Sequence, residues 1–98
     1  MANTYTQLYI HVVFATKRRG EIDIPEEHRE EVEKYLCGIA KNLKCHPIAI
    51  YCNPDHLHFL YSQPPSASVS DVVRDLKTFS SRFINEKNLT KGHFEWQS

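Results

Sequence analysis

The sequence predicts a small α+β domain in which two helices pack on one face of an antiparallel sheet. Residues 5–16 alternate apolar and polar side chains, which is typical of a strand with one buried face. Two later stretches repeat apolar residues at helical spacing. The resulting order is strand, helix, strand, strand, helix and the start of a strand, as in ferredoxin-like and RNA-recognition-like folds. We expect a single domain spanning residues 1–98.

The composition is that of an ordinary globular protein. Of the 98 residues, 41% are hydrophobic and 24% are charged, which excludes a disordered or low-complexity chain. No apolar run approaches the roughly 18 to 20 residues of a membrane span, and the first residues lack the pattern of a signal peptide. The three cysteines include no CxxC motif. We therefore expect a cytoplasmic protein with free thiols and no membrane partner.

The first strand is predicted over residues 5–16, and a turn at Gly20 follows it. One set of side chains should face the core: Leu8, Ile10, Val12 and Phe14. The other set should face away from it: Tyr5, Gln7, Tyr9 and His11.

The first helix is predicted from about Pro25 to Lys44. Proline suits the first helical position, and the acids after it suit the positive end of the helix dipole. Apolar residues recur at offsets of three and four, which defines a buried stripe: Val32, Tyr35, Leu36, Ile39, Ala40 and Leu43.

The second half of the chain predicts a hairpin and another helix. Residues 47–52 and 56–61 are apolar runs separated by Asn-Pro-Asp, a strong turn sequence. Ser68, with Asp71 three residues later, resembles a capping box that opens a helix ending near Lys87. Residues 91–98 are expected to begin a further strand. The helix should bury an apolar stripe: Val69, Val72, Val73, Leu76, Phe79, Phe83 and Ile84.

The net charge of zero conceals an uneven distribution. Residues 21–33 hold seven of the twelve acids and one of the twelve bases, so the remainder carries a net charge of about +6. The cluster of acidic residues is explained if these side chains form the solvent-exposed face of a helix. The basic remainder indicates a surface for polyanions, and the six candidates for phosphate contacts follow the first strand or lie along the second helix: Lys17, Arg18, Arg19, Arg74, Lys77 and Arg82.

His56-Leu57-His58 is the motif with the most chemical content. Residues two apart on a strand share a face, so both imidazoles can reach one metal ion while Leu57 points into the core. On spacing alone, two unliganded surface histidines explain the motif equally well. A four-ligand zinc site is disfavoured, because Cys45 and Cys52 are at odd separation and only one could join. His11 is either a third ligand or a sheet histidine satisfied by its neighbours.

Four blocks of the sequence together resemble the single-tyrosine, IS200-like transposases of the HUH (His-hydrophobe-His) endonuclease superfamily. The blocks occur in the same order and at comparable spacing over essentially the whole chain. They are Tyr5 to Lys17, Asn53 to Phe59, Val69 to Lys77 and Phe94 to Gln97.

The resemblance implies a homodimer that cuts and rejoins single-stranded DNA at ends marked by hairpins. By this resemblance, His56 and His58 of the present chain would hold a Mg²⁺ or Mn²⁺ ion on the scissile phosphate. A tyrosine on a later helix would then form a 5′-phosphotyrosine link. This chain ends one residue after the Trp96-Gln97 block, and none of its five tyrosines matches that position. We therefore expect no catalytic residue in this chain, because the nucleophile helix is absent.

Two rival interpretations remain at this stage. One is a plain single-stranded nucleic-acid-binding module, although the first and third strands lack the aromatic RNA-recognition pattern. The other is a nuclease-dead regulatory fragment that dimerises with a full-length transposase.

Overall fold

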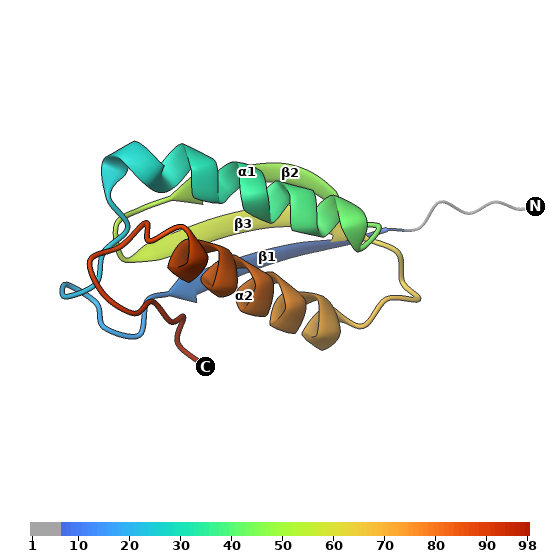
Figure 1. Ribbon diagram of the computed structural model, residues 1–98. Helices are drawn as coiled ribbons and strands as arrows, with labels where there is room; N and C mark the ends of the chain where they lie inside the picture. The colour runs from blue at the N-terminus through green and yellow to red at the C-terminus, as the bar shows by residue number, and fades with distance from the viewer. Residues whose placement is uncertain (1–6) are drawn as a thin grey trace, which may run out of the picture.

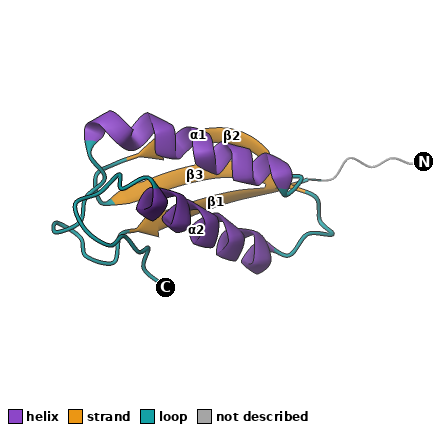
Figure 2. Ribbon diagram, viewed as in Figure 1, coloured by secondary structure: helices purple, strands orange, loops and turns teal. Residues whose placement is uncertain are grey.

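The computed structural model describes residues 7–98 as a three-stranded antiparallel sheet with two helices on one face (Figure 1). Figure 2 shows both helices in front of the sheet. The strand order β1-β3-β2 confirms the predicted α+β fold. Within the described part of the chain, neither helix is long and apolar enough to cross a membrane. The elements are β1 (Leu8–Ala15), α1 (Glu26–Asn42), β2 (His46–Cys52), β3 (His56–Gln63) and α2 (Val69–Glu86).

β3 is the central strand, and its register fixes which side chains enter the core. β1 pairs with β3 so that Phe14 lies opposite Leu57 and Val12 lies opposite Phe59. Leu57, Phe59 and Tyr61 are fully buried under the helices. The predicted core face of β1 is therefore confirmed, except that Leu8 at its start remains 38% exposed. The predicted beginning of this strand, including Tyr5, lies outside the described residues.

α1 begins one residue later and ends two residues earlier than predicted. Pro25 is its N-cap, in extended backbone (φ −62°, ψ 148°), rather than its first helical residue. The helix ends at Asn42, and Lys44 adopts a left-handed φ of 68°, which breaks the helical path. Four residues of the predicted stripe are buried, whereas Tyr35 at its margin stacks on Phe83 of α2.

α2 begins as predicted, because the Ser68 hydroxyl accepts a hydrogen bond from the backbone N–H of Asp71 at 3.2 Å. Its buried side chains are Val72, Leu76, Ser80 and Ile84. The prediction that Val69 and Phe79 are buried is wrong, since each is 38% exposed. Val69 lies in the first turn, and Phe79 lies at the margin of the buried face, where the Arg82 guanidinium is 5.5 Å from its ring centroid.

The C-terminal residues do not form the expected strand. A single antiparallel bridge joins Thr16 to Trp96 at the outer edge of β1. Asn85 of α2 holds the backbone of Phe94 from both sides, since its side chain donates to the carbonyl and accepts from the N–H of that residue. Phe94 and Trp96 are buried in the core. The alternation of these aromatic residues therefore marks a docked tail rather than a strand.

The Trp96 indole is anchored by a buried hydroxyl of α2. Its Nε1–H donates to Ser80 Oγ at 2.9 Å, and both residues are less than 10% exposed. Because an unpaired buried donor is costly, this hydrogen bond should contribute measurably to the docking of the tail.

Replacing Ser80 by alanine should lower the free energy of unfolding by about 1 to 3 kcal/mol, because the indole N–H is left buried without an acceptor. Ser81→Ala is the matched control, since the Ser81 hydroxyl only donates to the Thr78 carbonyl on the exposed helix surface. Urea denaturation of both variants measures the difference. Equal stability of the two variants would contradict the anchoring role of Ser80.

Candidate functional site

His56 and His58 lie on the face of the sheet opposite the helices. In the register of β1 and β3, His56 pairs with Ala15 and His58 pairs with Val13, while Leu57 between them is fully buried. The two imidazole centroids are 5.1 Å apart and nearly perpendicular. The prediction that both rings share the uncovered face is therefore confirmed.

His11 of β1 belongs to the same cluster. Its Nε2 atom lies 3.3 Å from Nδ1 of His58, and the two rings stack with centroids 5.5 Å apart. Two ring nitrogens at this distance share one proton, so one of them donates and the other accepts. The structure thus agrees with the second of the two alternatives for His11, a sheet histidine satisfied by a neighbour.

The turn between β2 and β3 supplies contacts to both nitrogens of His56. Asp55 Oδ1 accepts from Nδ1 at 2.8 Å, and Asn53 Nδ2 lies 3.1 Å from Nε2. Arg19 Nε donates to the second carboxylate oxygen of Asp55 at 3.3 Å. The hydrogen bond from His56, followed by that from Arg19, lowers the pKa of Asp55. No contact of Asn53 or Asp55 with the histidines was predicted from the sequence, although their adjacency to the His-Leu-His motif was a usable signal.

The cysteines do not contribute to this face. Cys45 and Cys52 were expected to point to opposite sides of the sheet, but both are buried in the core. The reason is a register shift between Pro47 and Ala49, which inserts one extra residue and reverses the alternation. Burial, with a smaller effect of the Glu33 carboxylate, raises the pKa of Cys52 to about 12. In residues 7–98, no group of three or more His, Cys, Asp or Glu side chains is arranged to hold a metal ion.

The first three basic candidates lie in the loop after β1, and one of them, Arg19, contacts Asp55 in the turn before His56. Lys17 forms an ion pair with Glu95 at 3.1 Å, and Arg19 contacts Asp55. Because the Thr16 N–H donates to the Asp55 carbonyl, this basic loop is held against the turn that precedes His56. Arg19 therefore borders the candidate site, whereas Lys17 and Arg18 line a small hollow with His93 and Glu95.

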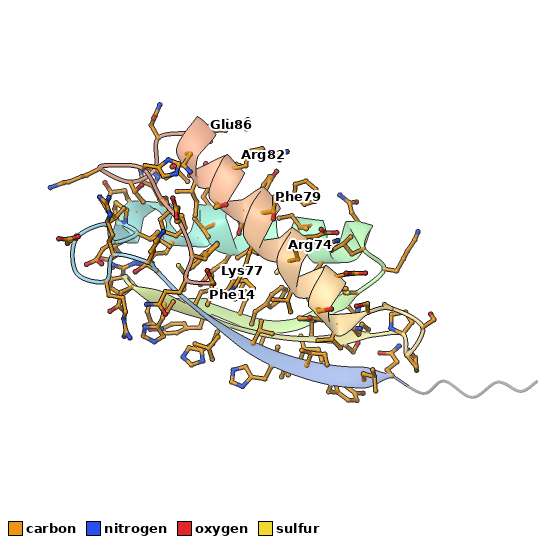
Figure 3. The ribbon with its side chains drawn as sticks, turned by 90° about the horizontal axis from the view of Figure 1, so that it is seen from below. Phe14, Arg74, Lys77, Phe79, Arg82 and Glu86 are labelled. Atoms are coloured by element: carbon orange, nitrogen blue, oxygen red, sulfur yellow. The ribbon has the colours of Figure 1, made fainter. Side chains whose placement is uncertain are left out.

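The other three basic candidates belong to the helical layer on the opposite face of the sheet. Arg74 pairs with two acids of α2, Asp71 and Asp75. Figure 3 shows Arg74 and Arg82 spaced along the helix, with Lys77 next to Phe14. Lys77 Nζ lies 5.6 Å from that ring centroid and donates to the Gln97 carbonyl at 2.7 Å. The structure thus places three of the six basic candidates in the loop after β1 and three on α2.

Aromatic side chains extend the uncovered face around the histidines. Tyr9 is 71% exposed, and Tyr51, which pairs with His58 across β2 and β3, is 64% exposed. The sequence had singled out Tyr9 but not Tyr51. A shallow depression of about 290 Å³ lies beside this tyrosine, and it is lined by His11, Ala49, Ile50, Tyr51, His58 and Leu60.

Comparison with protein families identifies relatives over the whole described fold. A family model described as "Transposase IS200 like" matches residues 4–98. Transposases for insertion sequence element IS200 from Salmonella typhimurium (strain LT2) and Salmonella typhi are each 33% identical over 89 residues. The alignment covers 89% of this chain and 57% of each relative. The chain therefore spans little more than half the length of these curated relatives.

Two solved structures share the fold. A proposed transposase from Deinococcus radiodurans R1 superposes with a TM-score of 0.81 at 21% identity, covering 100% of this chain and 83% of that one. A REP-associated tyrosine transposase bound to a REP hairpin superposes with a TM-score of 0.57 at 14% identity, covering 98% of this chain and 61% of that one.

Proposed function

The chain belongs to the IS200-like transposase family, and on that premise we propose that it provides the DNA-binding and metal-binding part of a transposase acting on single-stranded DNA. The reaction is the cleavage and rejoining of strand ends that carry hairpins. The observation that carries the proposal is the placement of His56 and His58 on one uncovered sheet face, beside a basic loop. Hairpin-containing single-stranded DNA is the expected substrate, the cytoplasm is the expected location, and a homodimer is the expected assembly.

The histidine pair fits a divalent metal ion, and we assign it Mg²⁺ or Mn²⁺. The Asp55 carboxylate orients the His56 ring from behind, which is the arrangement commonly found around metal-binding histidines. A divalent ion held there would withdraw charge from the phosphoryl oxygens of the scissile bond. His56 and His58 supply two protein ligands, so water or other groups complete the coordination. Since imidazole is a modest ligand for these ions, weak binding is expected.

The basic loop after β1 is assigned to the DNA backbone next to this site. Guanidinium and ammonium groups contact phosphates without reading the sequence, so Lys17, Arg18 and Arg19 position the strand. The exposed rings of Tyr9 and Tyr51 offer stacking surfaces for unpaired bases on the same face. Arg74, Lys77 and Arg82 lie along the helical layer and are assigned to a second length of the DNA. The hairpin-bound structural neighbour supports a hairpin ligand.

We assign the role of attacking nucleophile to none of the four tyrosines that the structure describes. Tyr61 is fully buried in the core, where burial raises the pKa of its hydroxyl to about 12. Tyr35 stacks on Phe83 in the helical layer. Tyr9 and Tyr51 share the histidine face and are given the stacking role. The histidine pair of this chain would therefore act together with a nucleophile carried by a helix of a partner subunit.

Manganese should bind at the two histidines and nowhere else with comparable affinity. In a titration of the chain with Mn²⁺ followed by NMR, line broadening should concentrate on His56 and His58, and His56→Ala should abolish it. His46→Ala is the matched control, because this exposed histidine begins β2 and pairs with Ser62, far along β3 from the site. Equal broadening of all six histidines would contradict the metal assignment.

DNA binding should favour a single strand with a hairpin over a duplex and should weaken steeply with salt. The double variant Arg18→Ala and Arg19→Ala should bind every sequence more weakly, and the slope of log affinity against log salt should fall by about 2. The pair Lys87→Ala and Lys91→Ala removes the same charge elsewhere and should change the slope less. Fluorescence anisotropy measures both slopes. Equal affinity for hairpin and duplex would favour a nonspecific nucleic-acid-binding module instead.

The outer edge of β1 supports the expected homodimer. Among the described residues, only the Thr16–Trp96 bridge pairs with this edge, so the backbone groups of Leu8 to Val13 on that side are open to another strand. Light scattering at high micromolar concentration should give the mass of a two-fold dimer. Val13→Pro would place a proline on this edge, because the backbone groups of the odd-numbered residues of β1 point outward, as those of Ala15 and Lys17 do. It should yield monomers, whereas a monomeric unsubstituted chain would refute the assembly.

A further inference from the structure

Each ring of the His-Leu-His pair is held through its Nδ1 atom by a different group. Nδ1 of His56 contacts the Asp55 carboxylate at 2.8 Å. Nδ1 of His58 contacts Nε2 of His11 at 3.3 Å. Asp55 belongs to the β2–β3 turn and His11 belongs to β1. Two separate elements of the fold therefore contact the two rings at the same ring atom, Nδ1.

The proton position on His56 follows from its two neighbours. An ionised carboxylate only accepts hydrogen bonds, so Nδ1 must carry the hydrogen. The Asn53 amide nitrogen only donates, and it lies 3.1 Å from Nε2, so that atom must present a lone pair. Contacts on opposite sides of the ring therefore specify the same tautomer, with Nε2 as the free base.

His58 reaches the same state if His11 accepts its proton. One of the two nitrogens that face each other must donate and the other must accept. When Nδ1 of His58 donates, its Nε2 keeps the lone pair, and His11 holds His58 as Asp55 holds His56. The contact joins β1 to β3, and the two rings are inclined by 27° with their centroids 5.5 Å apart.

We propose that Asp55 and His11 are positioning residues that keep His56 and His58 in the Nδ1–H tautomer, so that both rings present Nε2 to one divalent cation. The inference rests on the proposed metal-binding role of the two histidines. Arg19 supports the arrangement by holding the far oxygen of Asp55 at 3.3 Å. Asn53 has the opposite effect, because its amide occupies the Nε2 lone pair that the cation requires.

The first test measures tautomers in the metal-free, unsubstituted chain. At about pH 8, above the ordinary histidine pKa of about 6.5, imidazole ¹⁵N chemical shifts distinguish the two neutral forms. His56 and His58 should both be Nδ1–H, whereas exposed His46 should show the Nε2–H form that imidazole prefers in water. Finding Nε2–H at His56 or His58 would overturn the proposal without any variant.

The second test uses substitutions whose effects on Mn²⁺ affinity differ in sign. Asp55→Ala and His11→Phe should each shift one ring toward Nε2–H and weaken binding about 10- to 100-fold. Asp55→Asn keeps an acceptor oxygen and should restore most of the affinity. Asn53→Ala should tighten binding by about twofold to tenfold, because no amide then competes for Nε2. Glu86→Ala, which removes an exposed carboxylate of α2, is the control and should bind as the unsubstituted chain does.

Failure of this inference is distinguishable from failure of the proposed function. If His56→Ala abolishes Mn²⁺ binding while Asp55→Ala and His11→Phe leave affinity and tautomers unchanged, the positioning roles are wrong and the metal site stands. If the unsubstituted chain binds no Mn²⁺, the metal role and the positioning roles are overturned together.

Discussion

The two-residue period of β3 is the constraint on which the rest of the molecule depends. Leu57, Phe59 and Tyr61 are fully buried beneath the helices, and the residues between them point to the uncovered face. A slip of one residue would bring imidazoles into the core and expose large apolar side chains. The packing energy of the core therefore also sets the orientation of the histidines. The candidate site needs no separate scaffold, because the strand that builds the core also presents the two histidines.

Only one face of the sheet packs against the helices to form the core. Apolar residues on the other face therefore stay exposed to solvent. The helices cover one face, whereas Tyr9, Val13 and Tyr51 remain 71%, 54% and 64% exposed on the other. Apolar surface left in water contributes nothing to folding, and such patches commonly mark binding surfaces. The proposed binding of a cation and of unpaired bases requires that this face stay accessible. The tail compensates in part, since Phe94 and Trp96 enlarge the core from beyond α2.

The sequence was a good guide wherever a single periodicity decided the outcome. Alternation in β1 and the cap at Ser68 predicted the elements and the face that carries His56 and His58. The sequence-based predictions failed where a local irregularity interrupted the periodic pattern. The extra residue between Pro47 and Ala49 turned Cys45 inward, and side-chain hydrogen bonds from Asn85 docked the tail in place of strand pairing. Asp55 was missed as a partner of His56 because turn propensity explained it fully, and only the structure shows that its carboxylate contacts the His56 ring.

The contacts of the two histidines differ greatly in sequence separation, and this difference has a kinetic consequence. Asn53 and Asp55 lie within three residues of His56, so they can meet its ring as soon as the β2–β3 hairpin closes. His58 meets His11 across 47 residues, which requires β1 to dock after a much longer loop has closed. During folding, we therefore expect one half of the site to assemble locally and early, and the other half to appear only with the completed sheet. A partly folded chain would offer one ordered imidazole and would not capture a cation before the sheet is complete.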